Sequence, residues 1–206
     1  MLLFIRPCHH HRFRAVLNDA VRLRRETVQA DREPDASDDE AASYLVKLDA
    51  AGRVIASVRA MPATACNLDC DRLEHGMESA MPRGAHVVEI SRLCVAPELQ
   101  GEQRLRAVLE LRAGMAQLFG LHGWTQGVVV GHDDHIQPFI RSGMKVQALG
   151  LPVVLPGDSR LSFAVLASDP GRPGRAAELL AGSHPRLLDP HEDPSLFTRY
   201  GDRAVA

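Results

Sequence analysis

The chain has 206 residues, of which 45% are hydrophobic, so it can bury one sizeable core and a single domain is expected. Its net charge of −2 gives no electrostatic reason to expect a nucleic-acid partner. The N-terminal apolar run Met1–Ile5 is too short for a signal peptide or a membrane span, and four cysteines without a disulfide pattern are typical of a reduced, cytoplasmic protein.

Apolar residues recur along the chain at either strand or helix spacing, which separates predicted strands from predicted helices. The predicted strands, in chain order, are Leu2–Ile5, Ala42–Leu48, Val54–Met61, His86–Val95, Trp124–Val130, Met144–Leu149 and Leu161–Ala167. The predicted helices are Arg12–Val28, a short one near Arg72–Ser79, Leu105–Phe119 and Ile136–Ser142. Gln29–Asp39 is polar and acidic and is expected to be a loop, and Asp49–Gly52 is expected to be a hairpin turn.

The order of these segments predicts the fold class. His86–Val95 is almost continuously apolar, which is typical of a central strand. Hairpins mixed with helical crossovers favour an α/β domain with a mixed central sheet that is flanked by helices on both faces. We expect this domain to occupy residues 1–168, followed at residues 169–206 by an extension with a weak helix and a mobile tail.

Two ionic residues lie inside the apolar segment of the predicted central strand. Glu89 and Arg92 occur within Val87–Val95, where a charge is unfavourable unless it is paired or has a chemical role. Because they are three positions apart on a strand, we expect their side chains to point to opposite faces. A purely structural explanation is that Glu89 pairs with Arg59 and that Arg92 pairs with a loop carboxylate.

Other polar patterns have ordinary structural explanations. Asp35 and Asp38 lie in a polar loop, where acidic side chains usually serve solvation and turn formation. The adjacent histidines at 9–11 diverge in direction, and residues 132–135 are expected to form a loop and helix cap. Cys66 and Cys70 lack a second pair of zinc ligands, so no metal site is predicted.

Five segments, taken together and in order, resemble the acyl-homoserine-lactone synthase (autoinducer synthase) family. They are Leu23-Arg24 with Val28, the acidic loop Glu33–Asp38, the strand end Ser57–Pro62 with Arg59, the element Glu89-Ile90-Ser91-Arg92, and Ile140–Met144. The resemblance implies a GNAT-like acyltransferase fold with a splayed strand pair. In that fold the strand before the long helix, here Val87–Val95, separates from its neighbour and holds the pantetheine arm of an acyl carrier.

The resemblance also implies a reaction. An acyl group passes from acyl-carrier protein or acyl-coenzyme A to the amine of S-adenosylmethionine. The lactone ring then closes and methylthioadenosine is released. The acyl-homoserine lactone that forms is a quorum-sensing signal. Both reactants are substrates, no tightly bound cofactor is implied, and the carrier protein is the one macromolecular partner expected. No membrane partner is expected.

The matched positions receive roles from the resemblance. Glu89 and Ser91 are the candidate catalytic residues, with Glu89 as the base for the amine, and backbone N–H groups near Leu93 are candidates to stabilise the oxyanion. The candidate substrate-binding residues are Arg24, Asp35, Asp38, Arg59 and Arg92. The aspartates suit the cationic part of the substrate, and Arg24 or Arg92 suits its carboxylate. Val28, Leu73 and Leu93 are the candidate acyl pocket.

The chain departs from the family pattern at aromatic positions. Val28 and Leu73 stand where the family has Phe, and no Trp occurs between Arg24 and Asp35. Two alternatives therefore stay open. One is a GNAT-type acyltransferase that uses acyl-coenzyme A and a different amine, and the other is a non-catalytic descendant that binds a ligand.

Overall fold

A computed structural model describes residues 1–28, 40–65, 68–71, 82–133, 136–137, 140, 145–154, 161–167 and 185–201. The strands are β1 (Leu2–Ile5), β2 (Ser43–Leu48), β3 (Val54–Pro62), β4 (Val87–Val95), β5 (Gln126–His132), β6 (Val146–Ala148), β7 (Val153–Val154), β8 (Leu161–Ala167) and β9 (Leu187–Leu188). The helices are α1 (Arg14–Val28) and α2 (Gly101–His122), with a 3-10 turn at Pro7–His9 and a π-helical turn at Phe197–Gly201.

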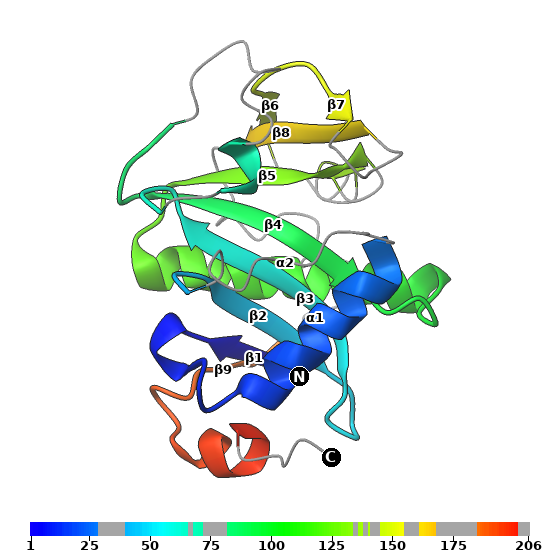
Figure 1. Ribbon diagram of the computed structural model, residues 1–206, viewed down its shortest axis with the longest axis vertical. Helices are drawn as coiled ribbons and strands as arrows, with labels where there is room; N and C mark the ends of the chain where they lie inside the picture. The colour runs from blue at the N-terminus through cyan, green and yellow to red at the C-terminus, as the bar shows by residue number, and fades with distance from the viewer. Residues whose placement is uncertain are drawn as a thin grey trace.

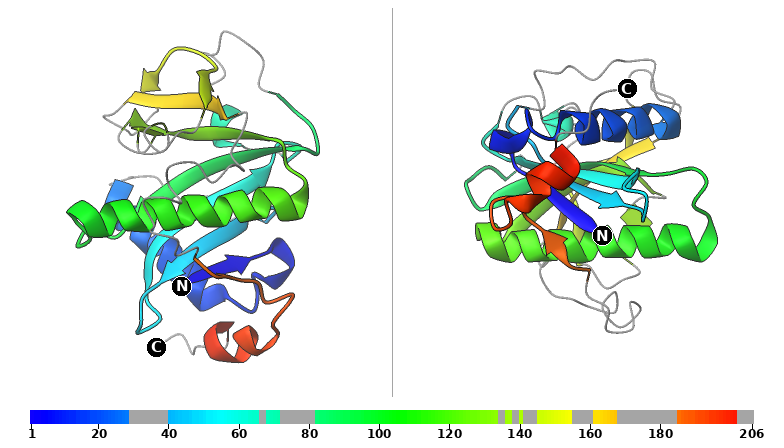
Figure 2. Two further views of the ribbon diagram at one scale, coloured as in Figure 1. Left: turned by 180° about the vertical axis from the view of Figure 1, so that it is seen from behind. Right: turned by 90° about the horizontal axis from the view of Figure 1, so that it is seen from below.

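One mixed sheet forms the centre of the molecule, as the order of segments predicted. Its strand order is β6-β8-β5-β4-β3-β2-β1-β9, with β7 beside β8. The pairs β4/β5 and β1/β9 are parallel, and the other pairs are antiparallel. Figures 1 and 2 show α1 on one face of this sheet and α2 on the other. The prediction of a mixed sheet with helices on both faces is therefore confirmed.

Alternation along the strands divides the apolar core between the two faces. Val58, Val88 and Ile90 belong to the core on the α2 face, and Met61 and Val87 belong to the core on the α1 face. Side chains with a period of two necessarily point to opposite sides of the sheet. Each fully buried Leu, Ile or Phe contributes about 2 kcal/mol to folding. The polar residues discussed below interrupt the α1-face core.

The strands β4 and β5 separate partway along their length, as the predicted splayed pair requires. They pair in register from Val87 with Gln126 to Ile90 with Val129. Beyond that point β4 continues to Val95 and β5 to His132 without further pairing between the two strands, both of which the structure describes in full. Figure 1 shows the two strands diverging.

Two kinds of feature differ from the prediction, namely the ends of the long helix and the presence of two very short strands. The predicted helix Leu105–Phe119 extends by about one turn at each end, and it ends at Gly123, which adopts φ 65° and donates its N–H to the Phe119 carbonyl. The strands β7 and β9 have two residues each, too few for a periodic pattern. The predicted helix Arg72–Ser79 lies entirely outside the described residues, and most of the predicted helix Ile136–Ser142 lies outside them too.

The described part of the predicted C-terminal extension packs against the start of the chain. Strand β9 runs parallel beside β1, and Asp189 forms an ion pair with Arg6. The Arg12 guanidinium lies 4.6 Å from the centre of the Phe197 ring, and Tyr200 is buried. Residues 185–201 therefore flank the sheet beside β1. The boundary at residue 168, and the weak helix and mobile tail expected at residues 169–206, stay predictions.

Asp189→Asn is expected to lower the free energy of unfolding by about 1 to 2 kcal/mol at pH 7. Burial would raise the pKa of Asp189, but the hydrogen bonds from Arg6 and from the His191 backbone outweigh burial and hold this pKa below its ordinary value. A carboxyl whose pKa is lower in the folded state adds stability above about pH 4, and this stability is lost as pH falls through the folded pKa.

Denaturant unfolding at pH 7 and pH 3 tests this prediction. The difference in stability between wild type and Asp189→Asn should be smaller at pH 3 than at pH 7. Glu192→Gln, which removes an exposed carboxyl from the same segment, is the control. Its free energy of unfolding should be close to that of the wild type at both pH values. A gap of equal size at both pH values would show that the charge of Asp189 does not stabilise the fold.

Candidate active site

A buried ionic network joins β3 and β4 on the α1 face of the sheet. The side chains of Arg59 and Glu89 are both 0% exposed, and Arg59 Nη2 lies 2.9 Å from Glu89 Oε1. Ser91 Oγ donates to the same Glu89 oxygen at 2.9 Å and accepts a hydrogen bond from Arg59 Nε at 3.1 Å. The antiparallel register places Arg59 opposite Ser91, so these side chains are neighbours on one face.

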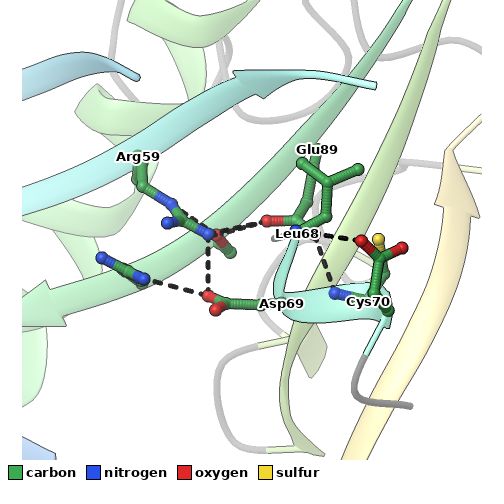
Figure 3. A network of polar contacts seen from close by, with 8 residues as sticks. Arg59, Leu68, Asp69, Cys70 and Glu89 are labelled. Atoms are coloured by element: carbon green, nitrogen blue, oxygen red, sulfur yellow. Dashed lines mark hydrogen bonds and ion pairs between the residues drawn. The ribbon is translucent and has the colours of Figure 1, made fainter. Parts of the chain in front are cut away.

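A turn at residues 68–71 covers this network, as Figure 3 shows. The Cys70 backbone N–H donates to Glu89 Oε2 at 2.8 Å. Asp69 Oδ2 lies 3.0 Å from Arg59 Nη2 and 3.3 Å from Arg92 Nε. The pairing of Glu89 with Arg59 and of Arg92 with a loop carboxylate, which the sequence allowed as a structural explanation, is confirmed. The loop carboxylate is Asp69, which no sequence pattern had identified.

A β-bulge in β4 brings Arg92 to the same side as Glu89. Arg59 is opposite Ser91 and Ser57 is opposite Cys94, so two residues of β4 face one residue of β3. Arg92 adopts the left-handed value φ 56° at this bulge. The alternation of side chains is interrupted there, and Arg92 reaches Asp69 on the α1 face. The expectation that Glu89 and Arg92 point to opposite faces is therefore wrong.

The left-handed backbone of Arg92 predicts an unusual order of stabilities. Arg92→Gly and Arg92→Ala both remove the contact with Asp69, but Gly adopts positive φ without strain. We expect the Gly variant to be more stable than the Ala variant by about 1 kcal/mol. At Arg25, an exposed helical position in α1, the order should reverse by about the same amount. Denaturant midpoints of the four variants test this, and an Ala variant at least as stable as Gly at position 92 would refute it.

Arg24 of α1 brings a third guanidinium to the network. Burial lowers the pKa of Arg24, and the nearby positive charge of Arg92 lowers this pKa further, whereas Asp69 raises it. Among the described residues, the Arg24 guanidinium makes no hydrogen bond or ion pair. It lines a cavity of about 20 Å³ whose walls are Ala20, Val21, Arg24, Tyr44, Ser57 and Arg92.

The charges of the network are unequal within the part of the chain that the structure describes. Three guanidiniums, those of Arg24, Arg59 and Arg92, face the two carboxylates of Asp69 and Glu89. Burial would raise the pKa of Asp69, but the three arginines outweigh burial and hold this pKa below its ordinary value. Such a site suits a ligand that brings a carboxylate of its own.

The candidate residues from the sequence fall into three groups. Arg24, Arg59, Glu89, Ser91 and Arg92 come together in one network. The Leu93 side chain belongs to the α2-face core, on the opposite side of the sheet. Asp35, Asp38, Leu73 and the side chain of Val28 lie outside the described residues. The acidic pair and the acyl pocket therefore stay predictions.

A metal site and a membrane-spanning helix are both absent from the described part of the chain. No group of three His, Cys, Asp or Glu side chains lies close enough to hold a metal ion among the described residues. Within those residues no helix is both long and apolar enough to span a membrane. A larger open hollow, of about 460 Å³, lies between the β2–β3 turn and Tyr200. Its lining includes none of the network residues.

One family model matches most of the chain, and solved structures share its fold. The family model described as autoinducer synthase matches residues 9–169. BjaI, a CoA-dependent acyl-homoserine lactone synthase solved with S-adenosylmethionine and isopentyl-CoA, has 22% identity and a TM-score of 0.71 over 92% of each chain.

Two further solved structures share the fold. The CoA-dependent synthase MesI has 21% identity and a TM-score of 0.73 over 91% of this chain and 99% of its own. The acyl-homoserine lactone synthase LasI has 16% identity and a TM-score of 0.66 over 81% and 89%. Comparison with curated proteins gives no significant match.

Proposed function

The chain belongs to the autoinducer synthase family, and from that premise we propose that it makes an acyl-homoserine lactone from S-adenosylmethionine and an acyl thioester, with its ionic network as the active site. The observation that carries the proposal is the convergence of Arg24, Arg59, Arg92 and Glu89 at one place beside the splayed strands. These residues come from α1, β3 and β4, so their meeting is a property of the fold.

The carboxylate of S-adenosylmethionine is assigned to Arg24. The sequence left Arg24 and Arg92 as equal candidates, but Arg92 contacts Asp69 at 3.3 Å. Arg24 is half-buried and lines the small cavity next to Arg92. A guanidinium in that setting binds a carboxylate through charge-assisted hydrogen bonds.

Glu89 is assigned to the removal of a proton from the substrate amine. Both Glu89 oxygens already accept hydrogen bonds, and the side chain is 0% exposed. The amine therefore reaches Glu89 through Ser91 or a water molecule, which accounts for the place of Ser91 between Arg59 and Glu89. The deprotonated amine attacks the thioester carbonyl, and the thiol leaves.

The separated edge of β4 is assigned to the acyl group. From residue 91 onward β5 no longer pairs with β4, so β5 does not occupy the backbone groups at this edge. N–H groups there stabilise the oxyanion of the tetrahedral intermediate. BjaI and MesI are CoA-dependent synthases, so acyl-coenzyme A is the first donor to test for this chain. Acyl-carrier protein and the cytoplasmic setting stay predictions.

Incubation of the protein with S-adenosylmethionine and a panel of acyl donors tests the proposal. Methylthioadenosine release together with a lactone is the expected result. Acyl transfer to another amine without methylthioadenosine would favour the first alternative above. Ligand binding without turnover of any donor would favour the non-catalytic alternative.

A further inference from the structure

The Asp69 carboxylate contacts two of the three guanidiniums in the network. Its Oδ2 lies 3.0 Å from Arg59 Nη2 and 3.3 Å from Arg92 Nε. The residue is 8% exposed, so these contacts are screened little by solvent. In effect, the chain provides an internal carboxylate for two of its three arginines.

The backbone on either side fixes where Asp69 lies. The Leu68 N–H donates to Asp71 Oδ2 at 3.1 Å, which closes the turn. The Cys70 N–H donates to Glu89 Oε2 at 2.8 Å, which ties the turn to β4. The turn therefore sets where the Asp69 carboxylate meets Arg59 and Arg92. The three arginines hold the pKa of Asp69 below its ordinary value, so it is charged at neutral pH.

We propose that Asp69 is a positioning residue that keeps Arg59 and Arg92 occupied, so that Arg24 alone binds the carboxylate of S-adenosylmethionine. This inference rests on the proposed function. It assigns a role to a residue outside the segments that resemble the family, and the role acts through the arginines rather than by contact with the reacting atoms.

The lactone-forming step explains why such a residue is needed. A carboxylate oxygen of the substrate attacks the γ-carbon of the same molecule, and a C–O bond forms. The C–S bond breaks, and its electron pair passes to the sulfonium sulfur. Methylthioadenosine then leaves as a neutral thioether. A carboxylate held by three guanidiniums has both oxygens engaged in hydrogen bonds and is a poor nucleophile. Bound by Arg24 alone, it keeps an oxygen available for attack.

Asp69→Asn in the full chain separates the two chemical steps. Thiol release reports acyl transfer, and methylthioadenosine release reports lactone formation. The wild type should release equal amounts. In Asp69→Asn, the ratio of thiol to methylthioadenosine should rise about fivefold, because Arg59 and Arg92 each lose one anionic partner and their positive charge then restrains the substrate carboxylate. Asp69→Glu, which keeps the charge, should restore a ratio close to that of the wild type.

Asp71→Asn is the matched control for damage to the turn. Asp71 lies in the same turn and pairs with Arg83, away from the three arginines. A general loss of folded protein lowers both products together and leaves their ratio unchanged. Asp71→Asn retains a side-chain acceptor oxygen for the Leu68 N–H, so the turn that places Asp69 stays closed and the wild-type ratio is expected. A ratio near one in an active Asp69→Asn enzyme would overturn the inference.

A binding measurement decides the case in which Asp69→Asn has no turnover. Calorimetry compares S-adenosylmethionine with its decarboxylated analogue, which keeps the sulfonium and amine. The preference for the carboxylate-bearing ligand should increase about tenfold in Asp69→Asn, and in the smaller neutral variant Asp69→Ser if Asn does not fold. An unchanged preference would overturn the inference. A wild-type enzyme that releases no methylthioadenosine would instead overturn the proposed function, and this inference with it.

Discussion

Glu89→Gln is expected to reduce methylthioadenosine release by about a thousandfold, because it removes the proposed base. It is also expected to lower the free energy of unfolding by about 3 kcal/mol, because it leaves Arg59 with one fewer buried partner. A carboxylate accepts hydrogen bonds from Arg59, Ser91 and the Cys70 backbone at once. A glutamine amide has one acceptor oxygen, so its NH₂ group must face one of these donors.

The loss of stability must be separated from the loss of chemistry. A double variant, Arg59→Met with Glu89→Leu, removes both buried charges and is expected to recover much of the stability without recovering turnover. Glu102→Gln, at an exposed position in the first turn of α2, is the control and should change neither quantity. Thermal unfolding and initial rates at saturating substrate supply the two readouts. Wild-type turnover in folded Glu89→Gln would remove Glu89 from the mechanism.

The sequence predicted the elements whose periodicity is long and regular. The continuous apolar character of β4 indicated a central strand, and the apolar stripe of α2 indicated a helix that covers one face. Glu89 and Arg92 also stood out, because charges inside an apolar segment need partners. Periodicity therefore located the sheet, the helices α1 and α2, and the centre of the network.

The geometry of the network depends on features that periodicity does not report. The bulge at Arg92 is a single irregular residue, and it reversed the predicted side of that side chain. Asp69 lies between Cys66 and Cys70 in a segment without a regular pattern, so its role depends on how the turn at residues 68–71 meets β4. Strand register and turn placement are tertiary properties, and the sequence alone did not determine them.

Arg24→Met is expected to raise the KM for S-adenosylmethionine about a hundredfold, because it removes the proposed ligand of the substrate carboxylate. Affinity for the decarboxylated analogue should change little, since that ligand has no carboxylate to lose. The fold should be as stable or slightly more stable, because burial lowers the pKa of Arg24 and the charge of Arg24 therefore opposes folding at neutral pH. Steady-state kinetics, calorimetry and denaturant unfolding test the three statements.

Arg22→Met is the matched control, because Arg22 lies on the same helix with its side chain 70% exposed. It should leave KM unchanged. Arg92→Met tests the other candidate for the substrate carboxylate, because it removes the arginine that contacts Asp69 at the bulge. If Arg92→Met, and not Arg24→Met, removes the discrimination between S-adenosylmethionine and its decarboxylated analogue, the carboxylate binds at the bulge of β4. Selective loss in Arg24→Met places it at α1, beside the half-buried guanidinium of Arg24.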